Sequence, residues 1–402
     1  MLCFCIKTDN ISFCGLPFFG IRDRILAILT EESLRRMKPR NPRRIISWKQ
    51  ACVCVCFYHE VIFMKLDDSK SVCVDEAKKV VWQVLLELPG RQHGASAVSN
   101  LFATLSTFFS HDCKWHVAHP VNEVLGSDIL PKLWQPLLSA MPDLDRRSDI
   151  FIGNTSRIED CETVWVAVTG HYVGTFQRSL FGISPTLQAA TLRFGEFYRM
   201  EGSRIVECYV LLDFIDLMRQ ANCFVLPPSR GIEGLSPGPQ FHDGLLRTVS
   251  PLHETEASLE LVEAMIFGGL SRFDGADIRS MGMELYWHPH MMWYGPSGIG
   301  TARGIEGFEG NHQRPFLHAF PDRQGGNHRA RIADGKFVAS TGWPSVYATH
   351  RGEYLGVSAT NRPVTMRVMD WWRREKSLLI ENWVFIDIPH LMLQMDVDLF
   401  ER

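Results

Sequence analysis

The chain contains two copies of one sequence pattern. Residues 207–220 read ECYVLLDFIDLMRQ and residues 381–394 read ENWVFIDIPHLMLQ, so a glutamate, an aspartate and a glutamine recur at the same spacing. The offset of 174 residues, which is the difference between positions 207 and 381, also relates LFGISPT at 180–186 to YLGVSAT at 354–360. A period of this length is too long for a solenoid repeat and suits two complete globular modules.

The composition describes an ordinary folded protein with no basic footprint. Hydrophobic residues make up 46% of the chain and charged residues 22%, which excludes a disordered or fibrous protein. The formal net charge of −3 disfavours nucleic-acid binding, because that binding depends on clustered lysine and arginine. No run of about 20 apolar residues suggests a membrane span. We therefore expect neither a nucleic acid nor a membrane as partner.

The cysteines are concentrated near the N-terminus, where Cys3, Cys5, Cys14, Cys52, Cys54, Cys56 and Cys73 account for seven of the eleven. The other four have no counterpart in the second copy, so a disulfide framework is disfavoured and free thiols in a reducing, cytoplasmic setting are expected. The run CVCVC could bind a metal through thiolates. It lacks a Cys-x2-Cys partner pair, however, and small buried hydrophobic residues are the favoured interpretation. We expect no metal.

Residues 1–75 have no counterpart in the second half of the chain. They carry a basic run, RRMKPRNPRR at 35–44, and Lys7 and Asp9 interrupt any early apolar segment, which disfavours a secretory signal. A targeting extension, a lineage-specific tail and a wrongly extended gene model starting before Met64 all stay open, and we favour the last. The predicted organisation is an N-terminal extension that is disordered or wrongly included (1–75), a first module (76–222), a Pro/Gly-rich linker (223–251) and a second module (252–402).

Each copy predicts helices first and strands afterwards. Residues 74–88 place apolar side chains at helical spacing, with Asp75 as the expected N-cap, and residues 255–267 are their counterpart. The segments that follow are rich in β-branched and aromatic residues and are interrupted by glycine turns, as strands are. This order predicts an α+β fold with an antiparallel sheet wrapped over helices. His288 and His290 flank a proline without a third metal ligand at recognisable spacing, so they are expected to mark the entrance of a strand.

The end of each copy resembles a known family. Residues 205–220 and 379–394 fit the pattern Ile/Val-Val/Ile-Glu-x-Trp/Tyr-x3-Asp-x3-Leu-x2-Gln. The preceding GISPT and GVSAT segments look like a family turn, although Ser184 and Ser358 replace its usual proline. Over about residues 76–402 the chain resembles a tandem SnoaL-like polyketide cyclase, within the superfamily of nuclear transport factor 2 and ketosteroid isomerase.

The resemblance implies two cone-shaped modules, each a strongly curved, mostly antiparallel sheet wrapped over about three helices, in a cystatin-like α+β barrel. In these cyclases an aspartate at the end of the last long strand acts as acid and base in ring closure without a cofactor. The matching positions are Asp213 and Asp387. A carboxylate in an apolar cavity has a raised pKa, which suits it to accept a proton next to a carbonyl and to return one near neutral pH.

Both aspartates have a second interpretation, because each begins the closing helix and could be its N-cap. Adjacent strand residues point to opposite faces, so one of Trp371 and Trp372 should line a cavity and the other the outer face. His390 takes the place of Asp216 in the alignment, which predicts that the two pockets differ. The residues expected to bind substrate are Trp293, Trp343, Arg367, Trp371, Trp383, His390, Arg193 and Tyr209.

Three functions are compatible with these residues. The favoured one is a cofactor-independent cyclase or isomerase acting on a small apolar metabolite such as a polyketide. The second is a non-catalytic module for ligand binding or dimerisation, in which the two copies pack as an intramolecular pseudo-dimer, with a further homodimer left open. The third is hydration as in limonene-epoxide-hydrolase relatives, using Arg367, Asp370 and Asp387. The fold alone does not choose among them.

Overall fold

The structure is a computed structural model that describes residues 5–7, 10–12, 73–88, 95–158 and 163–401. The chain divides into two units, residues 1–66 and 67–402. In the first unit, strand β1 (Cys5–Lys7) pairs with the antiparallel strand β2 (Asn10–Ser12). The remainder of the predicted N-terminal extension up to residue 72, including the CVCVC run, lies outside the described residues.

The first sheet of the second unit has the strand order β4-β3-β8-β7-β6-β5. The β3–β8 pair is parallel and the other pairs are antiparallel. Its strands are β3 (Phe109–Val117), β4 (Glu123–Leu125), β5 (Asp145–Thr155), β6 (Val164–Thr175), β7 (Ala189–Glu201) and β8 (Arg204–Leu212).

The second sheet repeats this topology in the order β10-β9-β15-β14-β13-β11, with β12 also paired to β13. Again the pair equivalent to β3–β8, which is β9–β15, is the parallel one. Its strands are β9 (Trp287–Tyr294), β10 (Ala302–Arg303), β11 (Gln324–Gly325), β12 (His328–Asp334), β13 (Phe337–Thr349), β14 (Pro363–Glu375) and β15 (Leu378–Ile386). His288 and His290 lie at the start of β9, as predicted.

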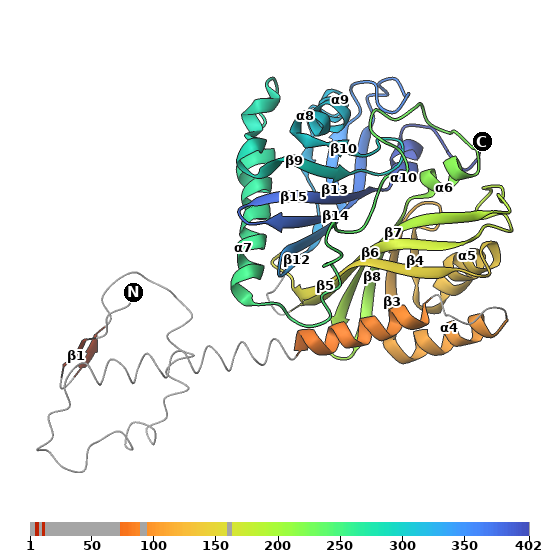
Figure 1. The fold of residues 1–402 in the computed structure, drawn as a ribbon, viewed down its shortest axis with the longest axis horizontal. Coiled ribbons are helices and arrows are strands. Elements are labelled where there is room, and N and C mark those ends of the chain that lie inside the picture. Colours follow the sequence, from red (N-terminus) through yellow and green to blue (C-terminus); the bar gives the residue numbers. More distant parts are fainter. Residues whose placement is uncertain (1–4, 8–9, 13–72, 89–94, 159–162, 402) are drawn as a thin grey trace, which may run out of the picture. The chain divides into compact units, whose positions relative to one another are not determined.

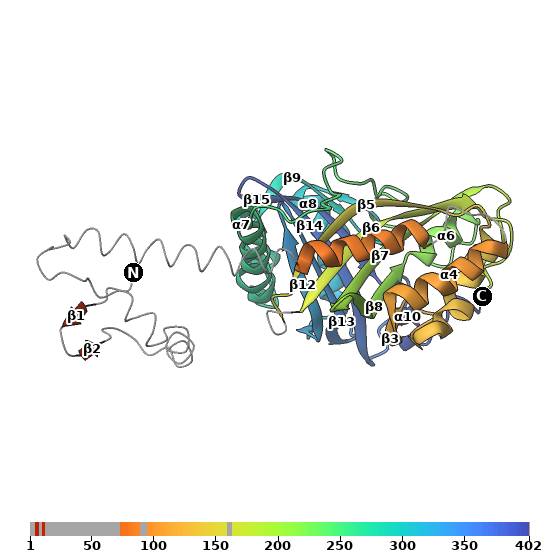
Figure 2. The same ribbon diagram turned by 90° about the horizontal axis from the view of Figure 1, so that it is seen from below.

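Helices cover one face of each sheet and close each module. In Figure 1 the helix of residues 73–87 and α4 lie along the lower side of the first sheet, and Figure 2, seen from below, shows them in front of its strands. Helix α7 contacts four strands of the second sheet. The first module has α4 (Ala95–Phe108), the helical turns Gly126–Asp128 and Leu130–Trp134, α5 (Gln135–Ala140) and α6 (Phe214–Gln220).

The second module has an equivalent set of helices. None of the described helices is long and apolar enough to cross a membrane. Because each copy has helices and a mostly antiparallel sheet, the predicted α+β class is confirmed for both copies. The helices are α7 (Leu252–Glu263), α8 (Gly304–Phe308), α9 (Arg314–Ala319) and α10 (Ile388–Gln394), with helical turns at Ala264–Gly269, Leu270–Arg272, Ile278–Met281, Met283–Leu285 and Glu309–Gln313.

The helix of residues 73–87 buries Val81, Val84 and the neighbouring Leu88. The prediction that Asp75 is its N-cap is wrong, because residues 73 and 74 are already helical. The Asp75 carboxylate instead accepts a hydrogen bond of 2.9 Å from the backbone N–H of Val249, at the end of the linker. A local capping pattern was overridden by a contact with a segment 174 residues away.

The two copies match down to backbone conformation in the GISPT and GVSAT turns. Leu180 and Ile183 exchange backbone hydrogen bonds of 3.1 and 2.9 Å, and Tyr354 and Val357 exchange two of 3.0 Å. The residue after the first of each pair has φ 50° in both copies, and the next, a glycine, has φ of 85° or 86°. A left-handed backbone at that second position favours glycine, which both copies retain.

The modules pack against each other through the sheet faces that point away from their helices. The Trp371 ring on β14 lies 5.1 Å from the Phe197 ring on β7. A side chain at Gly195 would place its Cβ only 2.9 Å from the Trp371 ring, so glycine is needed for this approach. Alternation along β14 turns Trp372 to the opposite, helix-covered face. Trp371 therefore lies in the contact between the modules, and a cavity position for Trp372 stays a prediction.

The segment 223–251 is irregular, and it is bound to both modules. Phe151 of β5 forms a parallel bridge to Leu245, and Thr301 forms an antiparallel bridge to Ile232. The Trp383 indole donates a hydrogen bond of 2.7 Å to the carbonyl of Pro237. This segment therefore forms part of the molecular surface between the sheets, where it contributes walls to the pockets described below.

Candidate functional site

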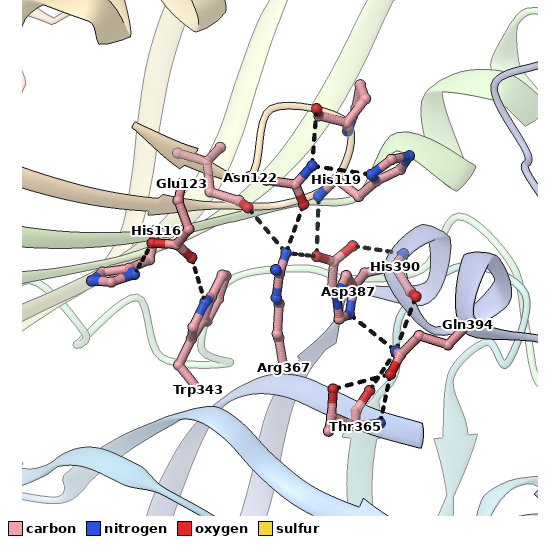
Figure 3. A network of polar contacts seen from close by, with 12 residues as sticks. His116, His119, Asn122, Glu123, Trp343, Thr365, Arg367, Asp387, His390 and Gln394 are labelled. Atoms are coloured by element: carbon pink, nitrogen blue, oxygen red, sulfur yellow. Dashed lines mark hydrogen bonds and ion pairs between the residues drawn. The ribbon is translucent and has the colours of Figure 1, made fainter. Parts of the chain in front are cut away.

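Asp387 lies at the contact between the two modules (Figure 3). It follows β15, and its Oδ1 accepts the backbone N–H of His390 at 3.2 Å, so it caps α10 as the second interpretation predicted. Its Oδ2 accepts the Arg367 guanidinium at 3.1 Å and the backbone N–H of His119, from the first module, at 3.1 Å. The carboxylate thus joins helix capping to a bond between modules.

Arg367 brings several of the predicted residues together around Asp387. Its Nη1 also donates to the side-chain oxygen of Asn122 at 3.0 Å, and its guanidinium lies 4.6 Å from the centre of the Trp343 ring. The Trp343 indole donates to Glu123 at 2.9 Å and packs edge-on against Tyr209 at 5.5 Å. Arg367, Trp343, His390 and Asp387 therefore form one cluster (Figure 3), which Tyr209 of the first module joins through its contact with Trp343.

The first copy has a similar arrangement around Asp213, but among the described residues no hydrogen bond joins Asp213 and Arg193. Its Oδ1 accepts the backbone N–H of Asp216 at 3.2 Å and its Oδ2 accepts that of Ser297, from the second module, at 2.9 Å. Arg193 donates to the backbone carbonyls of Tyr294 and Gly295 at 3.1 Å each. Each Asp thus accepts a backbone N–H across the module contact, Asp387 from the first module and Asp213 from the second, and each is also the N-cap of its helix.

The strand registers show which residues are equivalent in the two clusters. Trp115 pairs with Cys208, and Trp293 pairs with Asn382, which lies 174 residues after Cys208. Ser297 therefore takes the place of His119, and Gly300 that of Asn122. Gly170 and Gly342 pair with equivalent residues of β7 and β14, so His171 takes the place of Trp343. Smaller side chains line the first copy.

The smaller residues leave a pocket of about 350 Å³ around Asp213. Both modules and the segment 223–251 contribute to it. Its lining includes Arg193, Asp213, Asp216 and His171 from the first module, Ser297 and Gly300 from the second, and Ile232, Glu233, Leu235 and Ser236 between them. In the second copy, Trp343 and Asn122 occupy the equivalent positions and make direct contacts with Arg367.

The two clusters also differ in their proton affinities. Burial raises the pKa of Asp213, and burial together with the Asp213 charge raises the pKa of Asp216 to about 7. Burial raises the pKa of Asp387 as well, against the opposing effect of Arg367. At the position of Asp216 the second copy has His390, whose pKa burial lowers to about 4. The two clusters therefore differ in the pKa of the residue at this position, as well as in its identity.

Replacing Asp387 by alanine should lower the free energy of unfolding by about 2 kcal/mol, because it removes a helix cap and a hydrogen bond between modules. Chemical denaturation would measure the change. Asp387→Asn keeps the side-chain shape and one acceptor oxygen, so it should be less destabilising than alanine. Equal stability of the alanine variant and the wild type would show that the cluster contributes nothing to module packing.

The helix-covered interior of the first module is filled by a saturated polar network. Glu196 on β7 accepts both Arg146 nitrogens, at 2.7 and 3.0 Å, and the hydroxyls of Tyr172 and Tyr198, at 2.6 and 2.7 Å. Glu196, Tyr172 and Tyr198 are fully buried, and Phe194 packs beside Tyr172 at 4.5 Å. Every oxygen of this carboxylate is occupied, so it has no position left for a ligand.

The interior of the second module lacks this network. Asp370 replaces Glu196, and the strand registers put Gly325 at the place of Arg146 and Val346 at that of Tyr172. Among the described residues, Asp370 has one hydrogen bond, a long one of 3.4 Å from the Asn382 amide. Burial raises its pKa to about 7.

Several side chains of this interior are partly exposed. Val346, Val368, Asp370 and Ile386 are half-buried, whereas their counterparts Tyr172, Phe194, Glu196 and Leu212 are buried. Loss of the Tyr172 and Phe194 rings removes side-chain volume without an equal replacement at those positions. Asp370 is thus deep enough for burial to shift its pKa and yet has surface that solvent can reach.

The other predicted site residues are distributed over different surroundings. Trp293 lies in the second module, stacked on His312 at 4.4 Å. Trp383 packs on Tyr294 at 5.3 Å and Trp371 lies in the module contact, so neither shares the face of Asp370. Arg367 also lies on the opposite face of β14 from Asp370. The structure therefore does not assemble Arg367, Asp370 and Asp387 into one hydration site.

From the sequence, Asp370 was predicted to act only in the hydration alternative, with Arg367 and Asp387. One signal of its different surroundings is present in the sequence, because the arginine and tyrosines around Glu196 have no charged or hydroxyl counterparts around Asp370. Reading that signal requires the pairing of β5, β6 and β7, which the sequence does not supply. Among the described residues, no group of three or more His, Cys, Asp or Glu side chains could hold a metal ion.

Comparison with known families agrees with the two-module architecture. The model of the SnoaL-like polyketide cyclase family matches residues 93–221 and again 277–395, which is more than half of the chain. The chain belongs to this family, with two family domains in tandem. A search of curated protein sequences found no match.

Solved structures similar to the chain include putative polyketide cyclases and NTF2-like proteins. A putative SnoaL-like polyketide cyclase from Jannaschia sp. CCS1 is 18% identical and covers 37% of this chain and 97% of its own, with a TM-score of 0.33. IdmH, a putative polyketide cyclase from Streptomyces antibioticus, is 23% identical and covers 36% and 99%, with a TM-score of 0.27. An NTF2-like protein from Burkholderia thailandensis is 18% identical and covers 35% and 97%, with a TM-score of 0.28.

Proposed function

We propose that this protein is a cofactor-independent acid–base enzyme of the cyclase or isomerase type, with its working site in the interior of the second module. The observation that carries the proposal is Asp370, a deep but solvent-reachable carboxyl group with a pKa of about 7 and one long hydrogen bond. Such a group is present in both protonation states near neutral pH, as proton transfer to and from carbon requires.

The proposed chemistry uses residues of this chain alone. The Asp370 carboxylate takes a proton from the carbon next to a substrate carbonyl, and the enolate so formed either attacks a second carbonyl of the same molecule or is reprotonated elsewhere. The protonated Asp370 then returns its proton to the new alkoxide or to carbon, which restores the carboxylate. The Asn382 amide, which donates to Asp370 Oδ1 at 3.4 Å, holds the carboxyl group in position.

The walls around Asp370 suit an apolar substrate. Val346, Val368 and Ile386 are aliphatic and half-buried, and Trp372 lies on the same face of β14. Membership in a polyketide cyclase family supports a polyketide-like carbonyl compound as the substrate class. In this proposal the first module, whose interior is filled, is a scaffold. The predicted catalytic residues Asp213 and Asp387 cap helices and hold the two modules together.

Deuterium incorporation tests the proposal. Aryl β-diketones and cyclic enones would be incubated with the protein in deuterated water, and exchange or ring closure would be followed by NMR and mass spectrometry. We expect wild-type turnover of at least one compound and its loss in Asp370→Asn. Glu196→Gln, at the equivalent position of the filled module, and Asp387→Asn are the matched controls and should retain turnover if folded.

Other outcomes would redirect the assignment. Loss of turnover in Asp387→Asn or Asp213→Asn, with an unchanged melting temperature and an active Asp370→Asn, would place catalysis at the module contact. Binding of these compounds without turnover by any form would favour the alternative, a ligand-binding module. The Asp387 carboxylate supports a structural role for this cluster, because it is fully engaged in helix capping and in hydrogen bonds to Arg367 and His119.

A further inference from the structure

We propose that the pocket around Asp213 and Asp216 is a second binding site, which takes a small organic cation such as a primary alkylammonium. The pocket has a volume of about 350 Å³ and is formed by both modules and the segment 223–251. It is separate from the Asp370 interior, because Arg193 and Gly195 lie on the face of the first sheet that packs against the second module, opposite the helix-covered face of Glu196.

The cations that line this pocket are already engaged. Arg193 donates to the Tyr294 and Gly295 carbonyls, and the rim residues Arg147 and His171 both bind Asp149, at 3.0 and 3.1 Å. Neither Arg193 nor the rim pair has a hydrogen bond to the carboxyl groups on the pocket wall among the described contacts. An anionic ligand would therefore find no free cation there.

The acids of the pocket are not all matched. Glu233 forms an ion pair with Arg219 at 2.8 Å and accepts from Ser297 and Gly298. Asp213 accepts two backbone N–H groups. The Asp216 carboxylate accepts one hydrogen bond among the described residues, from the Gln220 amide to Oδ2 at 2.8 Å, and its Oδ1 has no partner among them. In its ionised form, Asp216 therefore carries the charge that a ligand cation would neutralise.

The remaining lining fits a short alkyl chain that ends in an ammonium group. Val173, Ile232, Leu235 and Pro237 supply apolar surface. Ile232 and Leu235 are 55% and 39% exposed, so covering them with an alkyl chain would remove apolar area from water. The Ser236 Oγ is buried without a partner among the described residues and could accept an N–H of the ammonium group.

The second copy provides an internal comparison. His390 stands in place of Asp216, and burial followed by the Arg367 charge keeps its pKa low. Trp343 stands in place of His171 and lies against Arg367. The equivalent location in the second copy thus lacks both the unpaired acid and the space. We therefore expect the cation site at the Asp213 cluster and not at the Asp387 cluster.

Calorimetric titration with n-butylammonium, n-butyrate and n-butanol at low ionic strength tests the inference. We expect n-butylammonium to bind at least about tenfold more tightly than either of the others. Asp216→Asn should weaken n-butylammonium binding by at least about tenfold, because it removes the charge and keeps the shape. His171→Trp, which copies the filled second cluster, should abolish binding while all carboxyl groups remain. Melting temperatures would confirm that each variant is folded.

Asp370→Asn separates this site from the proposed catalytic one, since it should bind n-butylammonium as the wild type does. The inference is overturned if n-butyrate or n-butanol binds as tightly as n-butylammonium, if folded Asp216→Asn retains wild-type affinity, or if n-butylammonium binds with no measurable affinity. None of these results depends on whether Asp370 is catalytic.

Discussion

Lys78→Met should lower the free energy of unfolding by about 3 to 5 kcal/mol, because it leaves a buried carboxylate without its cation. Lys78, on the helix of residues 73–87, is fully buried and pairs with Asp334 of the second module. Its ammonium group also donates to the Thr248 carbonyl at 2.9 Å, and Asp334 accepts the backbone N–H of Ser250 at 3.1 Å. One ion pair therefore ties the first helix, the segment between the modules and the second sheet together.

Urea unfolding at pH 7 would measure this loss. Lys79→Met is the matched control, because Lys79 is the next residue, is exposed and pairs only with the exposed Glu76, so it should leave stability unchanged. The double variant Lys78→Met with Asp334→Asn should regain part of the loss, since it no longer buries an unpaired charge. A single Lys78→Met variant as stable as the wild type would show that the pair does not hold the modules together.

Asp370→Asn should reduce turnover by about 100- to 10,000-fold, the range expected for loss of a general acid or base. If deprotonation of the substrate limits the wild-type rate, activity should rise with pH and reach half of its plateau near pH 7, where burial places the Asp370 pKa. The residual rate of Asp370→Asn should lack that inflection. A wild-type inflection unchanged in this variant would assign the titration to another group.

Asp370→Asn should raise the stability of the protein at alkaline pH, although it lowers turnover. A carboxyl group whose pKa is raised on folding contributes stability below its unfolded value of about 4 and loses that contribution as pH rises through the folded value near 7. Asp370→Asn removes this penalty, so at pH 8 the variant should be more stable than the wild type by about 1 to 3 kcal/mol. The difference in the free energy of unfolding should be small at pH 4. A variant less stable than the wild type at pH 8 would contradict the proposed environment of Asp370.

The duplicated modules have kept different spaces open. The first module fills its interior with the Glu196 network, and the second leaves Asp370 and its neighbours partly exposed. At the module contact the relation is reversed, because the Asp213 cluster has a pocket and the Asp387 cluster is filled by Trp343. Each change follows from a few substitutions between large and small side chains at equivalent strand positions. Copies of one fold thus acquire distinct sites without a change of topology.

The sequence by itself determined the duplication, the α+β class and the family. Those features are written in spacings along the chain: the recurrence of Glu207 and Asp213 at Glu381 and Asp387, the helical period of residues 74–88 and the β-branched strands. It also predicted the role of Asp387 as a helix cap, which the structure confirms, and the contrast between Asp216 and His390. Each of these depends on residues that are neighbours in the chain, where local physical rules apply.

Only the tertiary structure decided which carboxyl groups border open space. Asp75 looks like a helix cap in the sequence, but it binds Val249, and Lys78 meets a partner 256 residues away. The partial exposure of Asp370 depends on the side chains that β13 and β15 place beside it. The full burial of Glu196 depends on Arg146, which comes from a third strand. Burial and charge pairing are set by side chains that converge from distant strands, and spacing along the chain does not encode that convergence.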